Sequence, residues 1–165
     1  MDSYFMGRVN RPAMVPDIQF LGIRLRVMAQ ATELEDRVLA SLALASGTDS
    51  VSVSSAEGHF GTPITLFEAE LTKAADIRRF IGLMEKAGIL GRLSHDADAR
   101  TDEQCAFHFR LDKQKACLGE LALAEGRDAI DVRMKAAVYP AKRSAAVKLI
   151  SEWLQQFYDE RMRPT

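Results

Sequence analysis

The fold is decided by the stretch Phe107-His108-Phe109-Arg110-Leu111-Asp112-Lys113-Gln114. From Cys105 to Leu111 the odd positions are apolar, and His108 and Arg110 stand at even positions between them. A period of two predicts a β-strand with one buried face, and the charged residues that follow Leu111 predict the turn that ends it. The outer face of this strand therefore carries basic side chains.

Two more strands are predicted after this turn, over residues 118–124 and 129–139. In the second of them, Arg133 and Lys135 alternate with apolar residues and therefore face outward. Pro140 suits the first turn of a helix, because its fixed φ angle fits there and its missing N–H costs no hydrogen bond. Apolar residues at helical spacing form the predicted packed face of this last helix: Ala146, Ile150, Trp153, Leu154 and Phe157.

The first part of the chain contains further strands. Residues 18–28 alternate with the same period, which predicts a strand with Arg24 and Arg26 on its outer face. Residues 50–57 and a segment after the turn from Gly58 to Pro63 also alternate. Two such segments joined by a short glycine-containing turn predict a β-hairpin.

Two helices separate these strands. Thr32 begins a capping box, which predicts a helix that ends at Gly47 and has Leu34 in its buried stripe. Apolar residues at helical spacing predict a second helix over residues 73–87. Residues 91–104 are rich in Asp and Arg without an apolar period, and they are interpreted as a long mobile connection.

The predicted order is β-α-β-β-α-β-β-β-α. Strands that alternate cleanly need cover on one face only, so we expect an α+β fold of two layers. Its mainly antiparallel mixed sheet has helices packed on one face and leaves the other face open. Residues 17–160 form the single predicted domain, and residues 1–16, which have no sustained period, are expected to be a tail outside it.

Composition limits the classes of function. The 165 residues carry a formal net charge of −1, which excludes the strongly basic signature of a bulk nucleic-acid coat but leaves room for a local basic face. Two cysteines give no disulfide framework, and no segment has the length of a membrane-spanning helix or the pattern of a secretory signal. We therefore expect a soluble, cytoplasmic protein.

The outward positions of the strands form the first candidate site. They carry basic residues together with carboxylates such as Glu68 and Asp131. These charges could simply pair across strands on a solvated face. Alternatively, the face could be an RNA platform on which Arg and Lys contact phosphates.

Two loops are further candidates. Two glycines near His59 free the backbone of the hairpin turn to direct N–H groups toward an anion, although such a turn also needs no ligand. Lys113, Gln114 and Lys115 at the strand end could hold a phosphate, or they could be a solvated charged run. The three histidines lie in separate segments and the acidic residues between Asp96 and Glu103 lack the spacing of a calcium loop, so no catalytic set, metal site or cofactor is predicted.

Four motifs of the chain resemble an archaeal protein family described as a predicted RNA-binding subunit of the exosome. They are Gly58-His59-Phe60-Gly61-Thr62-Pro63-Ile64, Phe109-Arg110-Leu111-Asp112-Lys113-Gln114, Gly119-Glu120-Leu121 and Ala136-Ala137-Val138-Tyr139-Pro140. The resemblance covers residues 17–157. It implies an α+β fold similar to a ribosomal protein that binds the small RNA of the large subunit. It also implies RNA binding with a link to exosome subunits and RNA processing, and no catalytic residues.

The sequence is therefore interpreted as a non-enzymatic RNA-binding protein that contacts phosphates through loop and sheet-face residues. The alternatives are a protein-interaction module or homodimer without RNA binding, and a small phosphoester-handling enzyme that uses His59. The predicted RNA-binding residues are Arg24, Arg26, His59, Arg110, Lys113, Gln114, Lys115, Arg133 and Lys135.

Overall fold

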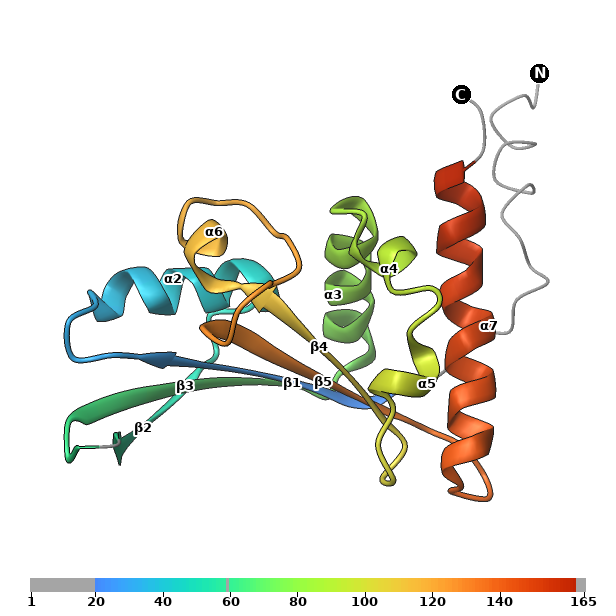
Figure 1. The fold of residues 1–165 in the computed structure, drawn as a ribbon, viewed down its shortest axis with the longest axis horizontal. Helices are drawn as coiled ribbons and strands as arrows, with labels where there is room; N and C mark the ends of the chain where they lie inside the picture. Colours follow the sequence, from blue (N-terminus) through green and yellow to red (C-terminus); the bar gives the residue numbers. More distant parts are fainter. Residues whose placement is uncertain (1–19, 59, 163–165) are drawn as a thin grey trace.

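The computed structural model describes residues 20–58 and 60–162, and within these residues five strands form one sheet (Figure 1). All neighbouring strands pair antiparallel, in the order β2-β3-β1-β5-β4. The predicted tail, residues 1–16, lies outside the described residues. The strands are β1 (Phe20–Ala29), β2 (Ser52–Glu57), β3 (Pro63–Leu71), β4 (Ala106–Asp112) and β5 (Ala129–Ala136).

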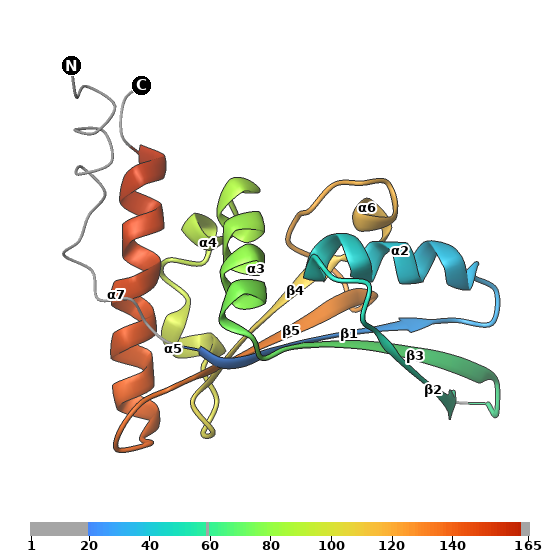
Figure 2. The same cartoon turned by 180° about the vertical axis from the view of Figure 1, so that it is seen from behind.

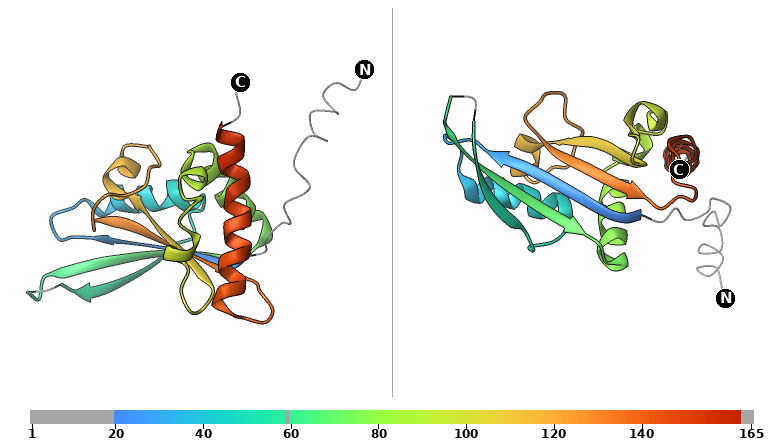
Figure 3. Two further views of the ribbon diagram at one scale, coloured as in Figure 1. Left: turned by 45° about the vertical axis from the view of Figure 1, so that its right-hand side comes forward. Right: turned by 90° about the horizontal axis from the view of Figure 1, so that it is seen from below.

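Six helices accompany the sheet in the described part of the chain: α2 (Glu35–Ser46), α3 (Ala74–Lys86), α4 (Ile89–Arg92), α5 (Ala97–Arg100), α6 (Lys113–Cys117) and α7 (Arg143–Met162). Helices α2, α3, α4 and α6 lie over one face, and α7 stands beside α4 and α5 (Figures 1 and 2). The other face is left open, as the view from below shows (Figure 3, right). The predicted two-layer α+β fold is thus confirmed, with a sheet that is antiparallel throughout. None of the described helices is long and apolar enough to span a bilayer.

The core lies between the sheet and the helices. Val132 and Phe109 are partners in the register of β5 and β4, and both side chains are buried against the helix layer. The ring of Phe109 stacks on Phe80 of α3 with centroids 6.5 Å apart, and Trp153 of α7 meets Phe20 edge-on at 5.1 Å. These contacts join β4, β1, α3 and α7 in one apolar cluster.

The alternation that predicted the strands is confirmed. In β4, Phe107, Phe109 and Leu111 are buried, whereas His108 is half-buried and Arg110 is exposed. Since side chains alternate across a strand, the residues that build the core on one face also fix the position of the polar residues on the other.

The predicted capping box is wrong. Helix α2 begins at Glu35, and no side-chain cap is formed. The Glu35 carboxylate accepts a hydrogen bond from the Thr65 hydroxyl at 2.8 Å instead of closing a box with Thr32. Leu34 consequently precedes the helix and is exposed, where the sequence predicted it in the buried stripe.

The predicted mobile connection is also wrong. Residues 91–104 contain the end of α4 and all of α5. Leu93 and Ala97 are buried in the core, and Arg143 of α7 donates hydrogen bonds to the Thr101 carbonyl at 3.0 Å and to the Asp98 carboxylate at 2.7 Å. Apolar contacts and this arginine therefore hold the segment in place.

The segment between β4 and β5 differs from the prediction as well. Residues 113–117 form the short helix α6, capped by the Asp112 carboxylate, and residues 118–124 are not a strand. They run along the outer edge of β4, where the Asp112 N–H bonds the Ala122 carbonyl and the Ala124 N–H bonds the Arg110 carbonyl. Leu123 makes only an isolated bridge with Leu111. This edge of the sheet is covered, whereas every residue of β2 at the opposite edge is exposed.

Candidate functional site

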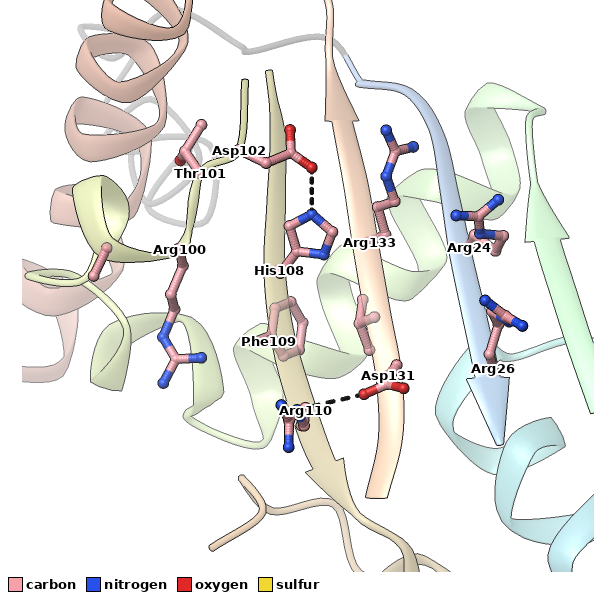
Figure 4. Close-up of a pocket in the computed structure, with 12 residues that line it drawn as sticks. Arg24, Arg26, Arg100, Thr101, Asp102, His108, Phe109, Arg110, Asp131 and Arg133 are labelled. Carbon is pink, nitrogen blue, oxygen red and sulfur yellow. Dashed lines mark hydrogen bonds and ion pairs between the residues drawn. The ribbon is translucent and has the colours of Figure 1, made fainter. Parts of the chain in front are cut away.

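A groove of about 540 Å³ lies on the open face of the sheet (Figure 4). Its lining comes from the three strands β1, β5 and β4 and from the segment that contains α5. We use the name basic groove for its six basic residues, which are Arg24, Arg26, Arg100, His108, Arg110 and Arg133.

The strand register arranges these residues in two rows across the sheet. In the first row, Arg24 of β1 stands opposite Arg133 of β5, which stands opposite His108 of β4. In the second row, two residues further along each strand, Arg26 stands opposite Asp131, which stands opposite Arg110. Alternation sends the strand side chains of both rows to the open face, and the strand order brings them together.

The first row contains an unbalanced pair of positive charges. Like charges directly opposite each other on neighbouring strands are destabilising, by up to about 1 kcal/mol. Arg133 has no ion pair with any carboxylate in the described residues, and Arg24 reaches Glu68 only at 3.8 Å. An anion placed between the two guanidinium groups would remove this repulsion.

The second row is close to neutral. Asp131 Oδ1 lies 3.5 Å from Arg110 Nε, and Glu68 of β3 lies 3.2 Å from Arg26 Nε. Each arginine of this row therefore has a carboxylate as an ion-pair partner. The positive charge of the groove that is not balanced in this way lies in the first row.

His108 is fixed by a carboxylate at the rim of the groove. Its Nε2 lies 2.6 Å from Asp102 Oδ2, and Asp102 also accepts the N–H groups of Gln104 and Ala106 (Figure 4). Partial burial acts to raise the pKa of Asp102, but the hydrogen bonds from His108, Ala106 and Gln104 outweigh it and hold the pKa below its usual value. Asp102 is thus an ionised partner that orients the ring of His108.

Lys113 is not part of this surface. Its side chain is fully buried, and its Nζ donates to the Met28 carbonyl at 3.0 Å and lies 2.8 Å from Glu33 and 2.6 Å from Asp128. Burial acts to lower the pKa of Lys113, but Asp128 and Glu33 raise it above its usual value. A phosphate contact needs an accessible ammonium group, so this prediction for Lys113 is corrected: the residue joins parts of the fold.

The remaining predicted residues fall in different places. Gln114 and Lys115 are exposed on α6, which packs beside α2 in the helix layer, away from the basic groove. Lys135 follows Arg133 on the open face, with its Nζ donating to the Gln104 carbonyl. His59 lies outside the described residues; around it, the Gly58 N–H bonds the Thr62 carbonyl at 2.6 Å and closes the hairpin turn.

The structure thus unites four predicted RNA-binding residues, Arg24, Arg26, Arg110 and Arg133, with His108, whose outward position was also predicted, and it adds Arg100 and Asp102. Arg100 was missed because its segment was interpreted as mobile. The spacing of Leu90, Leu93 and Ala97, three and then four residues apart, was the helical signal that pointed to an ordered segment. The described residues contain no cluster of His, Cys, Asp and Glu that could hold a metal ion.

Comparisons with known proteins agree on one group of relatives. A family model described as RNA binding matches residues 22–136, which include the whole basic groove. RNA-binding protein PAB1135 of Pyrococcus abyssi is 36% identical over 152 residues, which is 86% of this chain and 98% of that protein. Uncharacterised protein MJ0213 of Methanocaldococcus jannaschii is 29% identical over 78% of this chain and 93% of its own length. The solved structure of Mth689, a DUF54 protein from Methanothermobacter thermautotrophicus, matches with a TM-score of 0.73 and 31% identity, over 84% of this chain and 99% of that one.

Proposed function

Because the chain belongs to the family of proteins described as RNA binding, we propose that it binds RNA and that the basic groove is its contact surface. The observation that carries the choice of surface is the first row of the groove, where Arg24 stands opposite Arg133 without a carboxylate between them. A phosphate group there would meet two guanidinium groups and the neighbouring His108. Guanidinium groups bind phosphate through paired N–H donors, which suits this position.

The proposed mode of binding is electrostatic. Phosphate contacts supply affinity and orientation without reading the sequence, so a weak sequence preference is expected. Each phosphate that a cation neutralises releases counterions, and affinity therefore falls as salt increases. The role needs binding alone, and the proposal includes no catalytic step.

The decisive test is charge reversal in the first row. The double variant Arg24→Glu/Arg133→Glu should abolish RNA binding in a fluorescence-polarisation titration. A variant that still binds weakly should show a shallower slope of log affinity against log salt, by about one unit for each phosphate that the protein no longer neutralises. The matched control is Arg78→Glu/Arg92→Glu, which reverses two exposed arginines on α3 and α4 in the helix layer. An equal decrease in affinity in both double variants, or no binding by the wild-type protein at low salt, would refute the proposal.

We extend the proposal to RNA processing, with exosome subunits as protein partners. This part is supported by the family resemblance of the four sequence motifs and stands apart from the geometry of the groove. It predicts that the tagged protein recovers exosome subunits from cells after nuclease treatment. If recovery disappears once RNA is digested, the association is through shared RNA and a direct contact is ruled out.

A further inference from the structure

We propose that the basic groove takes duplex RNA across its minor groove, with the two backbones on the basic residues of β1 and β4 and the Asp131 carboxylate accepting a hydrogen bond from a ribose 2′-hydroxyl between them. This inference rests on the proposed function and specifies the class of RNA. It follows from how positive and negative charges are distributed over three neighbouring strands.

The basic residues form two lines that flank β5. Arg24 and Arg26 lie along β1, and His108 and Arg110 lie along β4, with the members of each line two residues apart. Neighbouring strands are about 4.8 Å apart, so the two lines run about 9.6 Å from each other, and the spacing within each line is about 6.7 Å. Two separate anionic backbones can be accommodated on these lines.

A carboxylate stands between the lines. Asp131 of β5 lies between Arg26 and Arg110 in the register, and its side chain is 66% exposed. A single phosphate backbone that ran along β5 would meet this negative charge. Two backbones on β1 and β4 would pass on either side of it, and Arg133 would stand between them in the first row, beside the phosphate that Arg24 contacts.

The chemistry of Asp131 identifies what faces it. An ionised carboxylate is only an acceptor of hydrogen bonds, so its partner must be a donor. The wide, shallow minor groove of A-form RNA presents 2′-hydroxyl donors, and proteins recognise duplex RNA largely by these groups and by phosphates. Asp131 can thus accept a hydrogen bond from the 2′-hydroxyl, a group that DNA lacks, and its negative charge disfavours a phosphate at the same position.

The groove also differs from a surface for single strands. Binding of single-stranded RNA relies on aromatic side chains on which successive bases stack. In the described residues of the groove, the only phenyl ring belongs to Phe109, and it faces the core. The fully exposed ring of Tyr139 follows β5 and is not part of the groove lining.

The experiment compares three ligands of one sequence, each about 16 base pairs or nucleotides long. They are an RNA duplex, the same duplex with 2′-fluoro sugars, which keeps an A-form helix but removes the 2′-hydroxyl donor, and one of the single strands. Wild-type protein should bind the RNA duplex at least tenfold more tightly than the single strand. It should bind the 2′-fluoro duplex about tenfold more weakly than the RNA duplex, which is the size of one hydrogen bond to a charged group.

Two variants isolate the hydrogen bond from the charge. Asp131→Ala removes both the acceptor and the negative charge, whereas Asp131→Asn removes the charge but keeps an acceptor oxygen. Asp131→Ala should bind the RNA and 2′-fluoro duplexes equally well, and Asp131→Asn should keep most of the discrimination. If the single strand binds as tightly as the duplex, or if Asp131→Ala still discriminates between the two duplexes, the inference is overturned while RNA binding stands. If no RNA form binds, the proposed function itself fails.

Discussion

Lys113 Nζ lies 2.8 Å from the Glu33 carboxylate, although 80 residues separate the two in the chain. This contact ties the start of α6 to the connection between β1 and α2, and the same ammonium group also reaches Asp128 ahead of β5. Three segments that surround the end of the sheet are therefore joined by one buried charge.

Removal of Lys113 should destabilise the fold. Lys113→Ala leaves Glu33 and Asp128 without their cation and opens a cavity, and breaking a buried ion pair in this way costs about 3 kcal/mol or more. We expect about 2–3 kcal/mol here, because Asp128 keeps contact with water. Urea unfolding measures the decrease, and Lys115→Ala, an exposed lysine of the same helix, is the matched control with a change within about 0.5 kcal/mol. Equal stability of the two variants would show that the buried contact contributes nothing.

Stability should fall in acid through two carboxylates. Burial acts to raise the pKa of Glu33, but hydrogen bonds from Lys113 and Gln30 hold it below its usual 4.5, and the pKa of Asp102 lies below its usual 3.8. A carboxylate with a lowered folded pKa contributes stability that is complete above the unfolded value and is lost as the pH falls through the folded value. The decrease should therefore begin near pH 4.5 and continue below pH 3.8.

The same linkage predicts how stability changes at alkaline pH. The pKa of Lys113 is raised above its usual 10.5, so its contribution is complete below that value and disappears only as the pH rises through the higher folded value. Urea unfolding midpoints measured from acid to alkaline pH test both the acid and the alkaline decrease in stability. Glu33→Gln should flatten the acid limb, and an unchanged acid slope in this variant would contradict the assignment.

Replacement of Arg133 should stabilise the fold and weaken RNA binding. Arg133→Thr removes one of two like charges that face each other and places a β-branched residue in a strand, so it should raise the free energy of unfolding by about 0.5 kcal/mol. The gain should shrink at high salt, which screens exposed charges. RNA affinity should fall at the same time. Arg26→Thr serves as the control, because it breaks a contact with Glu68 and should not stabilise the fold.

Phe109 should contribute strongly to the stability of the core beneath the groove. Its ring is buried and stacks on Phe80, so Phe109→Ala should cost about 3–5 kcal/mol because it removes buried apolar surface and leaves a cavity behind. Thermal unfolding followed by circular dichroism measures this cost. Leu118→Ala, at an exposed side chain just after α6, should change the midpoint little, and a comparable drop in both variants would contradict the core assignment.

The sequence predicted which side chains of each strand face outward, because a period of two is a local property. It therefore placed Arg24, Arg110 and Arg133 on one open face. It could not predict that Arg24 stands opposite Arg133, since this depends on β5 pairing between β1 and β4 and on the register of strands more than 100 residues apart. The two charge rows, and hence the position of Asp131 between them, appear only in the folded chain.

Lys113 was misassigned for a related reason. A lysine in a charged run at a strand end is usually solvated, and its partners Glu33 and Asp128 come from distant segments. In contrast, the order of α4 and α5 could have been predicted, because Leu90, Leu93 and Ala97 carry helical spacing within a short window. The dominance of Asp and Arg in that window concealed the pattern.

The two edges of the sheet differ in a way that bears on self-association. Residues 122–124 bond the backbone of Arg110 and Asp112 at the outer edge of β4, and Asp102 bonds the Ala106 carbonyl there, so the edge left open to a second sheet is β2, whose six residues are all exposed. Two copies that pair β2 with β2 around a twofold axis would use up the open edge of both. No further copy could then add to the sheet, and concentrated protein should form dimers in preference to fibres.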